Sequence, residues 1–325
     1  MAASFLHCPT SSTTKLYSNA LSKPKFPHSS SSSYSYKPIK AGMFEHSASW
    51  ATVNTDVEKN IKTILADREP ATIFEPMSHL VGEVPRSMAP ALCVAACEVV
   101  GGDREKAIAA ACALHLMHTA TYTHEYLQLS NPAMGLARPM GHHGYGPVVE
   151  LLAGDGMIPI GYELLAAMES QPNSNSQHIV QVMGEVAFAM GAQGMVHGQY
   201  LKMKCMGLVG DVPVDDATIY EALEKKGGAL YSCGAACGAI LGGGSEEEIE
   251  KLRRFGLYVG MIHNIMVRDV LGKDKKLMKF AASLRFLALK ELEGMREKNV
   301  EKIASIIDGF SIFLRVQKFK FPTRA

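Results

Sequence analysis

The sequence carries almost no excess charge of either sign. Its 33 lysine and arginine residues face 32 aspartate and glutamate residues, which leaves a formal net charge of +1. Such a chain produces no broad field that would attract nucleic acid or an anionic membrane. Long hydrophobic runs are missing too: none reaches the roughly 18 residues that a membrane span requires, and the richest, Ala109 to Leu116, is interrupted by His115. We therefore expect no nucleic-acid partner and no membrane span.

Cysteine is scarce, and its count is odd. No secretory signal precedes the cysteines, and they are spread over the whole chain. Disulfide frameworks occur mainly in small secreted domains with an even number of cysteines, so we expect free thiols. The seven residues are Cys8, Cys93, Cys97, Cys112, Cys205, Cys233 and Cys237.

The N-terminal segment contains no acidic residue before Glu45 and no arginine. Ser29 to Ser33 is an unbroken serine run, several lysines make the segment basic, and no compact apolar stretch is present. This composition is typical of organelle targeting, with a merely disordered tail as the alternative, and the lack of arginine favours a plastid over a mitochondrion. We predict a disordered plastid transit peptide at 1–45, a folded domain at 46–312 destined for the stroma, and a tail at 313–325 without an assigned role.

From Trp50 onward, apolar residues recur at three- and four-residue spacing, and alternating strand-like runs are scarce. The pattern predicts one all-α domain. Ser245 and Glu248 should form a capping box after the glycines Gly242 to Gly244, and two ion pairs at i, i+4 spacing should follow. The expected helices are Ala51–Ala66, Ala89–Val100, Glu105–Gln128, Val148–Glu169, Gln177–Met203, Asp215–Leu241, Glu246–Val270, Lys275–Met295 and Val300–Ile312.

Several segments together carry a family pattern. They are Ala91 to Gly102 (ALCVAACEVVGG), Glu150 to Gly156 (ELLAGDG), and Ala239 to Gly244 (AILGGG), which leads into a Glu-rich helix ending in Arg-Phe-Gly. In this order they resemble trans-isoprenyl diphosphate synthases of the plant geranylgeranyl diphosphate synthase type, over most of the chain. The resemblance implies a helical bundle around a central cavity, in which two aspartate clusters hold Mg²⁺ against a substrate diphosphate.

Both aspartate clusters are missing here. The first belongs at Thr123 to Asn131, where Glu125 is the single carboxylate, and the second at Val267 to Leu271, where Asp269 stands alone beside a cation. One carboxylate at each place cannot hold two or three Mg²⁺ ions. We therefore predict a chain without catalytic residues that binds no metal or other cofactor.

The basic elements that the resemblance implies are also reduced. At Pro85 to Pro90 only Arg86 remains as a cation, and the loop Pro132 to Ala137 is uncharged, with Arg138 displaced. Loss of the acidic clusters together with the basic grips, in an intact helical frame, indicates a pseudo-enzyme.

Two Cys-x-x-x-Cys elements are present, Cys93 with Cys97 and Cys233 with Cys237. Such a pair marks the small subunits of plant geranyl diphosphate synthases. The resemblance implies that all four cysteines contact a catalytic large subunit of the geranylgeranyl diphosphate synthase type, which holds the Mg²⁺, in a heterodimer or heterotetramer. The implied role is to shift the product of that subunit to the ten-carbon geranyl diphosphate for monoterpene synthesis.

Other interpretations remain open. Buried cysteine behaves as a small hydrophobe, so the four cysteines could be core residues, while the spacing gives zinc poor support. His115 and His118 share a helix face and could bind a metal or be core histidines. The chain could also be a prenyltransferase active by itself, with Glu125, Asp155 and Asp269 as unusual ligands; the missing carboxylates favour the regulatory subunit.

Overall fold

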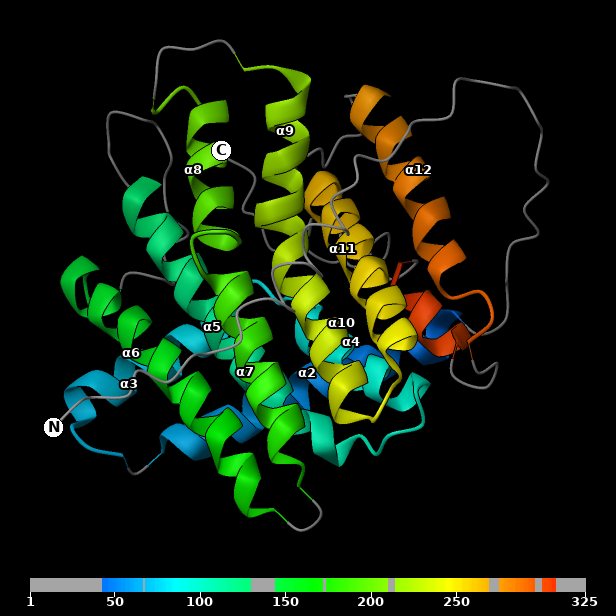
Figure 1. Ribbon diagram of the computed structural model, residues 1–325. Coiled ribbons are helices and arrows are strands. Elements are labelled where there is room, and N and C mark those ends of the chain that lie inside the picture. Colours follow the sequence, from blue (N-terminus) through cyan, green and yellow to red (C-terminus); the bar gives the residue numbers. More distant parts are fainter. Residues whose placement is uncertain are drawn as a thin grey trace, which may run out of the picture. The chain divides into compact units, whose positions relative to one another are not determined.

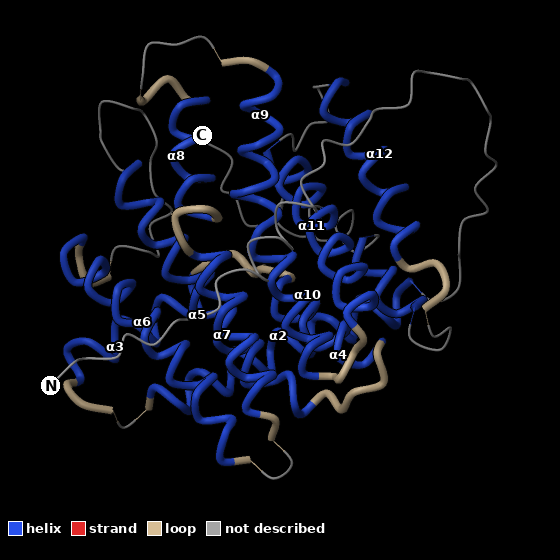
Figure 2. Tube along the Cα trace, viewed as in Figure 1, coloured by secondary structure: helices blue, strands red, loops and turns tan. Residues whose placement is uncertain are grey.

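The computed structural model of the chain describes residues 43–66, 68–129, 144–171, 174–209, 214–268, 275–295 and 300–307. These residues form helices joined by turns, and none of them belongs to a β-strand (Figures 1 and 2). The all-α prediction is confirmed. The predicted transit peptide, apart from 43–45, and the tail at 313–325 lie outside the described residues, so the domain boundaries stay predictions.

The helices follow one another in a bundle, with 300–307 also helical after the last labelled one. Their bounds are α2 (Met43–Leu65), α3 (Ala71–Glu83), α4 (Ala89–Val99), α5 (Glu105–Leu129), α6 (Pro147–Ala167), the 3₁₀ turn η3 (Met168–Ser170), α7 (Ser176–Met190), α8 (Met195–Cys205), α9 (Asp216–Ala222), the π-turn η4 (Leu223–Gly228), α10 (Ala229–Leu241), α11 (Glu246–Arg268) and α12 (Lys275–Glu291).

Helices α4 and α10 form the centre of the core. Every residue of α4 except Glu98 is buried, and so is nearly all of α10. Glycines four residues apart let the backbones touch: a Cβ at Gly234 would lie 2.7 Å from the Ala89 carbonyl oxygen, and one at Gly242 would lie 2.8 Å from that of Cys97. At Gly238, between them, the added atom would overlap the Cys93 carbonyl. The two helices are therefore packed backbone to backbone.

The predicted helix start after the glycine run is confirmed. Gly243 adopts a positive φ of 78°, and the amide of Gly244 donates to the carbonyl of Ala239 at 2.9 Å, which closes α10 in a Schellman motif. The Ser245 amide then donates to Glu248 at 2.8 Å, and the Glu248 amide donates to the Ser245 hydroxyl at 3.3 Å. The expected ion pairs Glu247–Lys251 and Glu250–Arg254 are both present.

Two predictions about the helices were wrong. Helix α3 was not predicted, since it contains Pro76, which the bundle buries. The segment Gln177 to Met203 is two helices, because the chain turns at Gly191 to Gly194, where a Cβ at Gly194 would overlap the Ala189 carbonyl. The segment Asp215 to Leu241 runs on as predicted but passes through the π-turn η4.

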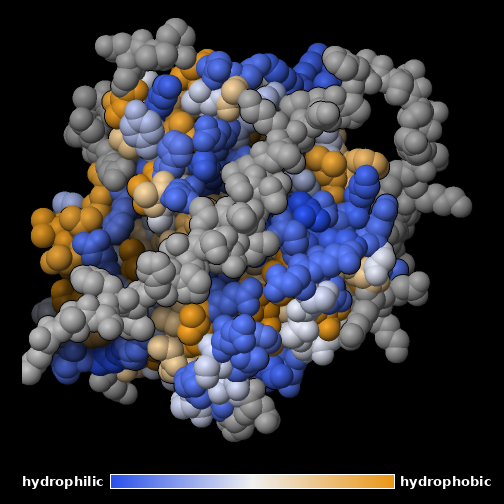
Figure 3. All heavy atoms as spheres, in the orientation of Figure 1, coloured by the Kyte–Doolittle hydropathy of each residue, from blue (hydrophilic) through white to orange (hydrophobic). Residues whose placement is uncertain are grey.

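Two helical segments leave apolar surface uncovered. Pro147–Ser170 and Ser176–Cys205 are long and apolar enough to cross a membrane by length and composition alone, yet only 39% of the most apolar window in each is buried. On α6, the exposed fractions are 70% for Val148, 44% for Leu151 and 50% for Leu152, and apolar atoms gather over the start of α6 at the left edge of Figure 3. The predicted absence of a membrane span stays a prediction.

Candidate functional site

Glu125, at the C-terminal end of α5, is held by two lysines. Lys202 from α8 pairs with one carboxylate oxygen, and the Nζ of Lys226 from η4 lies 3.0 Å from the other. The Glu125 side chain is only 10% exposed. Burial by itself would raise the pKa of this carboxyl, but the charges and hydrogen bonds of Lys226 and Lys202 outweigh burial and hold the pKa below its ordinary value. Glu125 is therefore ionised, and its negative charge is compensated by the two lysines.

No metal centre is formed by the part of the chain that the structure describes: no group of three or more His, Cys, Asp or Glu side chains is placed to hold an ion. Asp155 does not join Glu125, since it lies 62% exposed on α6 with its Oδ1 3.2 Å from the Nε2 of His124. Asp269, the third ligand of the alternative interpretation, falls outside the described residues. The described carboxylates thus do not converge on a common ion.

Two of the three histidines on α5, His115 and His118, make hydrogen bonds inside the protein. The Nε2 of His115 donates to the carbonyl of Val81 at 3.3 Å, and that of His118 donates to the carbonyl of Pro85 at 2.8 Å. Burial lowers the pKa of both rings, to about 4 for His118. Because each Nε2 carries its proton toward a carbonyl, the rings are not arranged as a metal pair.

Arg86, the cation that remains from the basic grip, is paired within the chain. Its Nε lies 2.9 Å from the Oε1 of Glu58 on α2. Tyr231 on α10 completes this side of the site, because its hydroxyl accepts from the Met88 amide at 3.2 Å and lies 3.0 Å from the Nδ1 of His263. Neither Tyr231 nor the two lysines at Glu125 was predicted, since no motif marks them.

The four predicted cysteines lie in the core between α4 and α10. Cys93, Cys97 and Cys237 are 0% exposed and Cys233 is 2% exposed. The thiols of Cys233 and Cys237 are 3.7 Å apart, and that of Cys237 also approaches the carbonyl of Val182 on α7 at 4.0 Å. The six described cysteines are all free, as expected. Their role in partner binding stays a prediction, and from these positions it would be indirect.

Burial also controls the reactivity of these thiols. It raises the pKa of Cys97 to about 12 and that of Cys93 well above its ordinary value, while the Cys233 contact and burial raise the pKa of Cys237. A thiol that stays protonated and shielded is neither a nucleophile nor a metal ligand at physiological pH. The cysteines thus act by packing.

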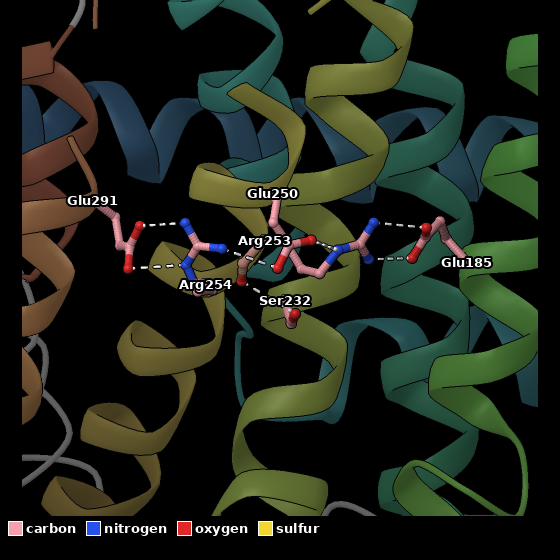
Figure 4. A network of polar contacts seen from close by, with 6 residues as sticks. All are labelled: Glu185, Ser232, Glu250, Arg253, Arg254 and Glu291. Atoms are coloured by element: carbon pink, nitrogen blue, oxygen red, sulfur yellow. Dashed lines mark hydrogen bonds and ion pairs between the residues drawn. The ribbon is translucent and has the colours of Figure 1, made fainter. Parts of the chain in front are cut away.

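A chain of charged side chains crosses the bundle beside this core (Figure 4). The guanidinium of Arg253 on α11 makes two contacts with Glu185 on α7, at 2.5 and 2.8 Å, and its Nε donates to Glu250 at 3.0 Å. Arg254 joins Glu250 to Glu291 on α12. Glu185 and Arg253 are 7% and 8% exposed, so this pair ties α7 to α11 from the inside.

Comparison with known proteins shows which family this sequence resembles. Residues 70–283 match the family described as polyprenyl synthetase. A chloroplastic protein of Cannabis sativa named heterodimeric geranylgeranyl pyrophosphate synthase small subunit 2 is 40% identical, over 95% of this chain and 100% of its own length.

Two solved structures are similar as well. The geranyl diphosphate synthase small subunit from Antirrhinum majus is 41% identical with a TM-score of 0.71, over 82% of this chain and 99% of its own. A chain of the heterotetrameric geranyl pyrophosphate synthase of mint is 40% identical with a TM-score of 0.67, over 80% and 98%.

Proposed function

The chain belongs to the polyprenyl synthetase family, and from this premise we propose that it is a non-catalytic small subunit that works in plastids by binding a catalytic partner. The partner is a large subunit of the geranylgeranyl diphosphate synthase type, which binds the Mg²⁺ and is directed towards geranyl diphosphate. One observation carries the loss of catalysis. The carboxylate of Glu125 is paired with two ammonium groups, so it has no charge left to offer a divalent ion.

The proposal also specifies the length of the product, a ten-carbon chain. The Cannabis sativa relative is named for geranylgeranyl pyrophosphate synthase, whereas the Antirrhinum majus and mint structures are of geranyl diphosphate synthases. All three are similarly identical to this chain. The assignment to the ten-carbon product therefore rests on the two Cys-x-x-x-Cys elements and on the two solved structures, and product analysis decides it.

The partner needs an apolar surface, and the start of α6 and the outer side of α7 each expose apolar side chains that can contribute to one. Val148, Leu151 and Leu152 are exposed on α6, and Val180 is 68% exposed on α7, which contacts α6. Burying about 800 Å² on each side is typical of a stable interface, and apolar side chains dominate its centre. A second protein of the same helical fold would remove these side chains from water.

The four buried cysteines affect this surface indirectly, through the packing of the helices beneath it. The Cys237 thiol approaches the Val182 carbonyl of α7 at 4.0 Å, on the side of the helix opposite Val180, and all four cysteines are buried where α10 packs against α4. A larger side chain at these positions would displace α10 and with it α7. In this way buried residues influence how a partner docks, in the presence or absence of reducing agent.

The function is tested by adding the chain to Mg²⁺ and labelled five-carbon diphosphates, alone and with a geranylgeranyl diphosphate synthase. We expect no product from the chain alone and a shift to geranyl diphosphate with the partner. Condensation by the pure chain, above a preparation control, would overturn the proposal. A partner product that stayed at twenty carbons would restrict it to another regulatory effect.

The surface is tested by co-purification. Leu151→Glu with Leu152→Glu should abolish retention by a tagged partner, because two buried charges oppose the contact. Phe286→Glu is the matched control, since Phe286 is 67% exposed on the distant α12 and is not part of the proposed surface. Equal loss in both variants, or flotation of the wild-type chain with lipid vesicles instead of capture by the partner, would contradict the assignment of this face.

A further inference from the structure

We infer that the ammonium groups of Lys202 and Lys226 form a built-in substitute for a divalent cation at Glu125, which joins α5, α8 and η4 without metal. This site is distinct from the partner surface and does not depend on it. The inference rests on the convergence of three elements, on the balance of charge and on an unpartnered amide nearby.

The three elements converge because α8 and η4 touch through their backbones. Gly198 lies one turn before Lys202, and a Cβ there would come within 2.6 Å of the carbonyl carbon of Lys225. This approach sets Lys202 and Lys226 on the same carboxylate, one ammonium on each oxygen of Glu125. Two ammonium groups that bind the same carboxylate repel each other, so the charge of Glu125 is what keeps them together.

The balance of charge is that of a metal site. One carboxylate and two ammonium groups sum to a single positive charge, as one carboxylate and one divalent cation do. The Lys226 side chain is 12% exposed and that of Lys202 is 28% exposed, so water screens the cluster only in part. An ammonium group anchored to the chain costs no binding step, and the arrangement is formed whenever the chain folds.

Helix α8 carries one more polar group, the side-chain amide of Gln199. Both polar atoms of the Gln199 amide are buried and have no hydrogen-bond partner among the described residues. Gln199 precedes Lys202 by three residues on α8, which puts the two side chains on neighbouring parts of one face. Amide oxygens are ligands that hard divalent cations accept. If the ammonium groups were replaced by a carboxylate, the cluster should accept such an ion.

The experiment compares thermal unfolding of the full chain in Mg²⁺ and in a chelator. The wild type should unfold at the same temperature in both. The double variant Lys202→Glu/Lys226→Gln should lose stability in chelator and gain about 3 to 5 °C for every tenfold rise of Mg²⁺ above its Kd. The matched control is Lys204→Glu/Lys225→Gln, which makes the same charge changes on the same two elements and should show no Mg²⁺ response.

A Mg²⁺ response of the wild type, or an equal response of the two double variants, would overturn the inference. Should the Lys202→Glu/Lys226→Gln variant fail to fold, a cycle of Glu125→Gln, Lys226→Gln and their combination replaces it. Glu125→Gln leaves two ammonium groups facing each other, so the combined variant should unfold at a higher temperature than Glu125→Gln alone. Additive losses would show that the lysines do not act as counter-ions of Glu125.

Discussion

Replacing Arg253 with methionine should be among the most damaging single changes at a charged residue. The substitution keeps most of the aliphatic volume but removes the guanidinium, and with it both contacts to Glu185 and the bond to Glu250. Glu185 is 7% exposed, so its carboxylate would stay buried after losing both contacts with the guanidinium. Breaking a buried pair in this way costs about 3 to 5 kcal/mol, out of a total stability of roughly 5 to 15 kcal/mol.

The neighbouring arginine provides a matched control. Arg254 makes an equally well-formed pair with Glu291, at 2.9 and 2.8 Å, but its side chain is 31% exposed. Water can therefore solvate Glu291 once the guanidinium is gone, and Arg254→Met should cost only about 1 kcal/mol. The two variants change the same residue type on the same helix, so their difference measures burial.

Urea unfolding followed by circular dichroism measures both costs as free energies of unfolding. In a separate thermal scan, we expect the melting temperature of Arg253→Met to fall on the order of 10 °C. The double variant Glu185→Leu/Arg253→Met leaves no orphaned charge and should recover most of the loss. The reasoning is refuted if Arg253→Met costs no more than Arg254→Met, or if the double variant loses the sum of its two single changes.

Three further outcomes are expected. Gly238→Ala should cost at least about 2 kcal/mol, because the methyl group would overlap the Cys93 carbonyl, whereas Gly184→Ala, which meets open space, should raise stability by up to about 1 kcal/mol in the same urea titration. Burial lowers the pKa of His118 and His263 to about 4 from 6.5, so the unfolded chain binds protons that the folded chain refuses. Stability measured at several pH values should be fully present above pH 6.5 and fall as the pH drops towards 4, by up to about 1.4 kcal/mol per pH unit for each ring. A thiol reagent followed by mass spectrometry should label Cys205 first among the described cysteines, since the others are buried.

The helical frame could be predicted because it depends on local patterns. The capping box at Ser245 and the glycine stop before it are sequence signals with a direct backbone consequence, and both are present. Helix α3 was missed because Pro76 disfavours a helix in isolation, and only burial against α2 and α6 compensates for it. The break near Gly191 was missed for a related reason, since glycine is tolerated within many helices.

The site could be predicted only in part. The position of Glu125 as an isolated carboxylate follows from the resemblance, but its two lysines come from helices far along the chain. Which cation reaches a carboxylate depends on how α8 packs on η4, and Gly198 controls that contact by leaving out a side chain. The cysteine spacing has the same limit, because an i, i+4 pair places two thiols on one face of a helix whether that face meets the core or a partner.

The buried charges and the exposed apolar face bear on the same helix, α7. On its inner side α7 is held by the Glu185–Arg253 pair and by the contact of Cys237 with Val182, and on its outer side it presents Val180. A helix held at fixed distance and rotation presents one defined surface, so little entropy is lost when a partner covers it. The proposed small subunit can in this way keep a rigid surface for a partner.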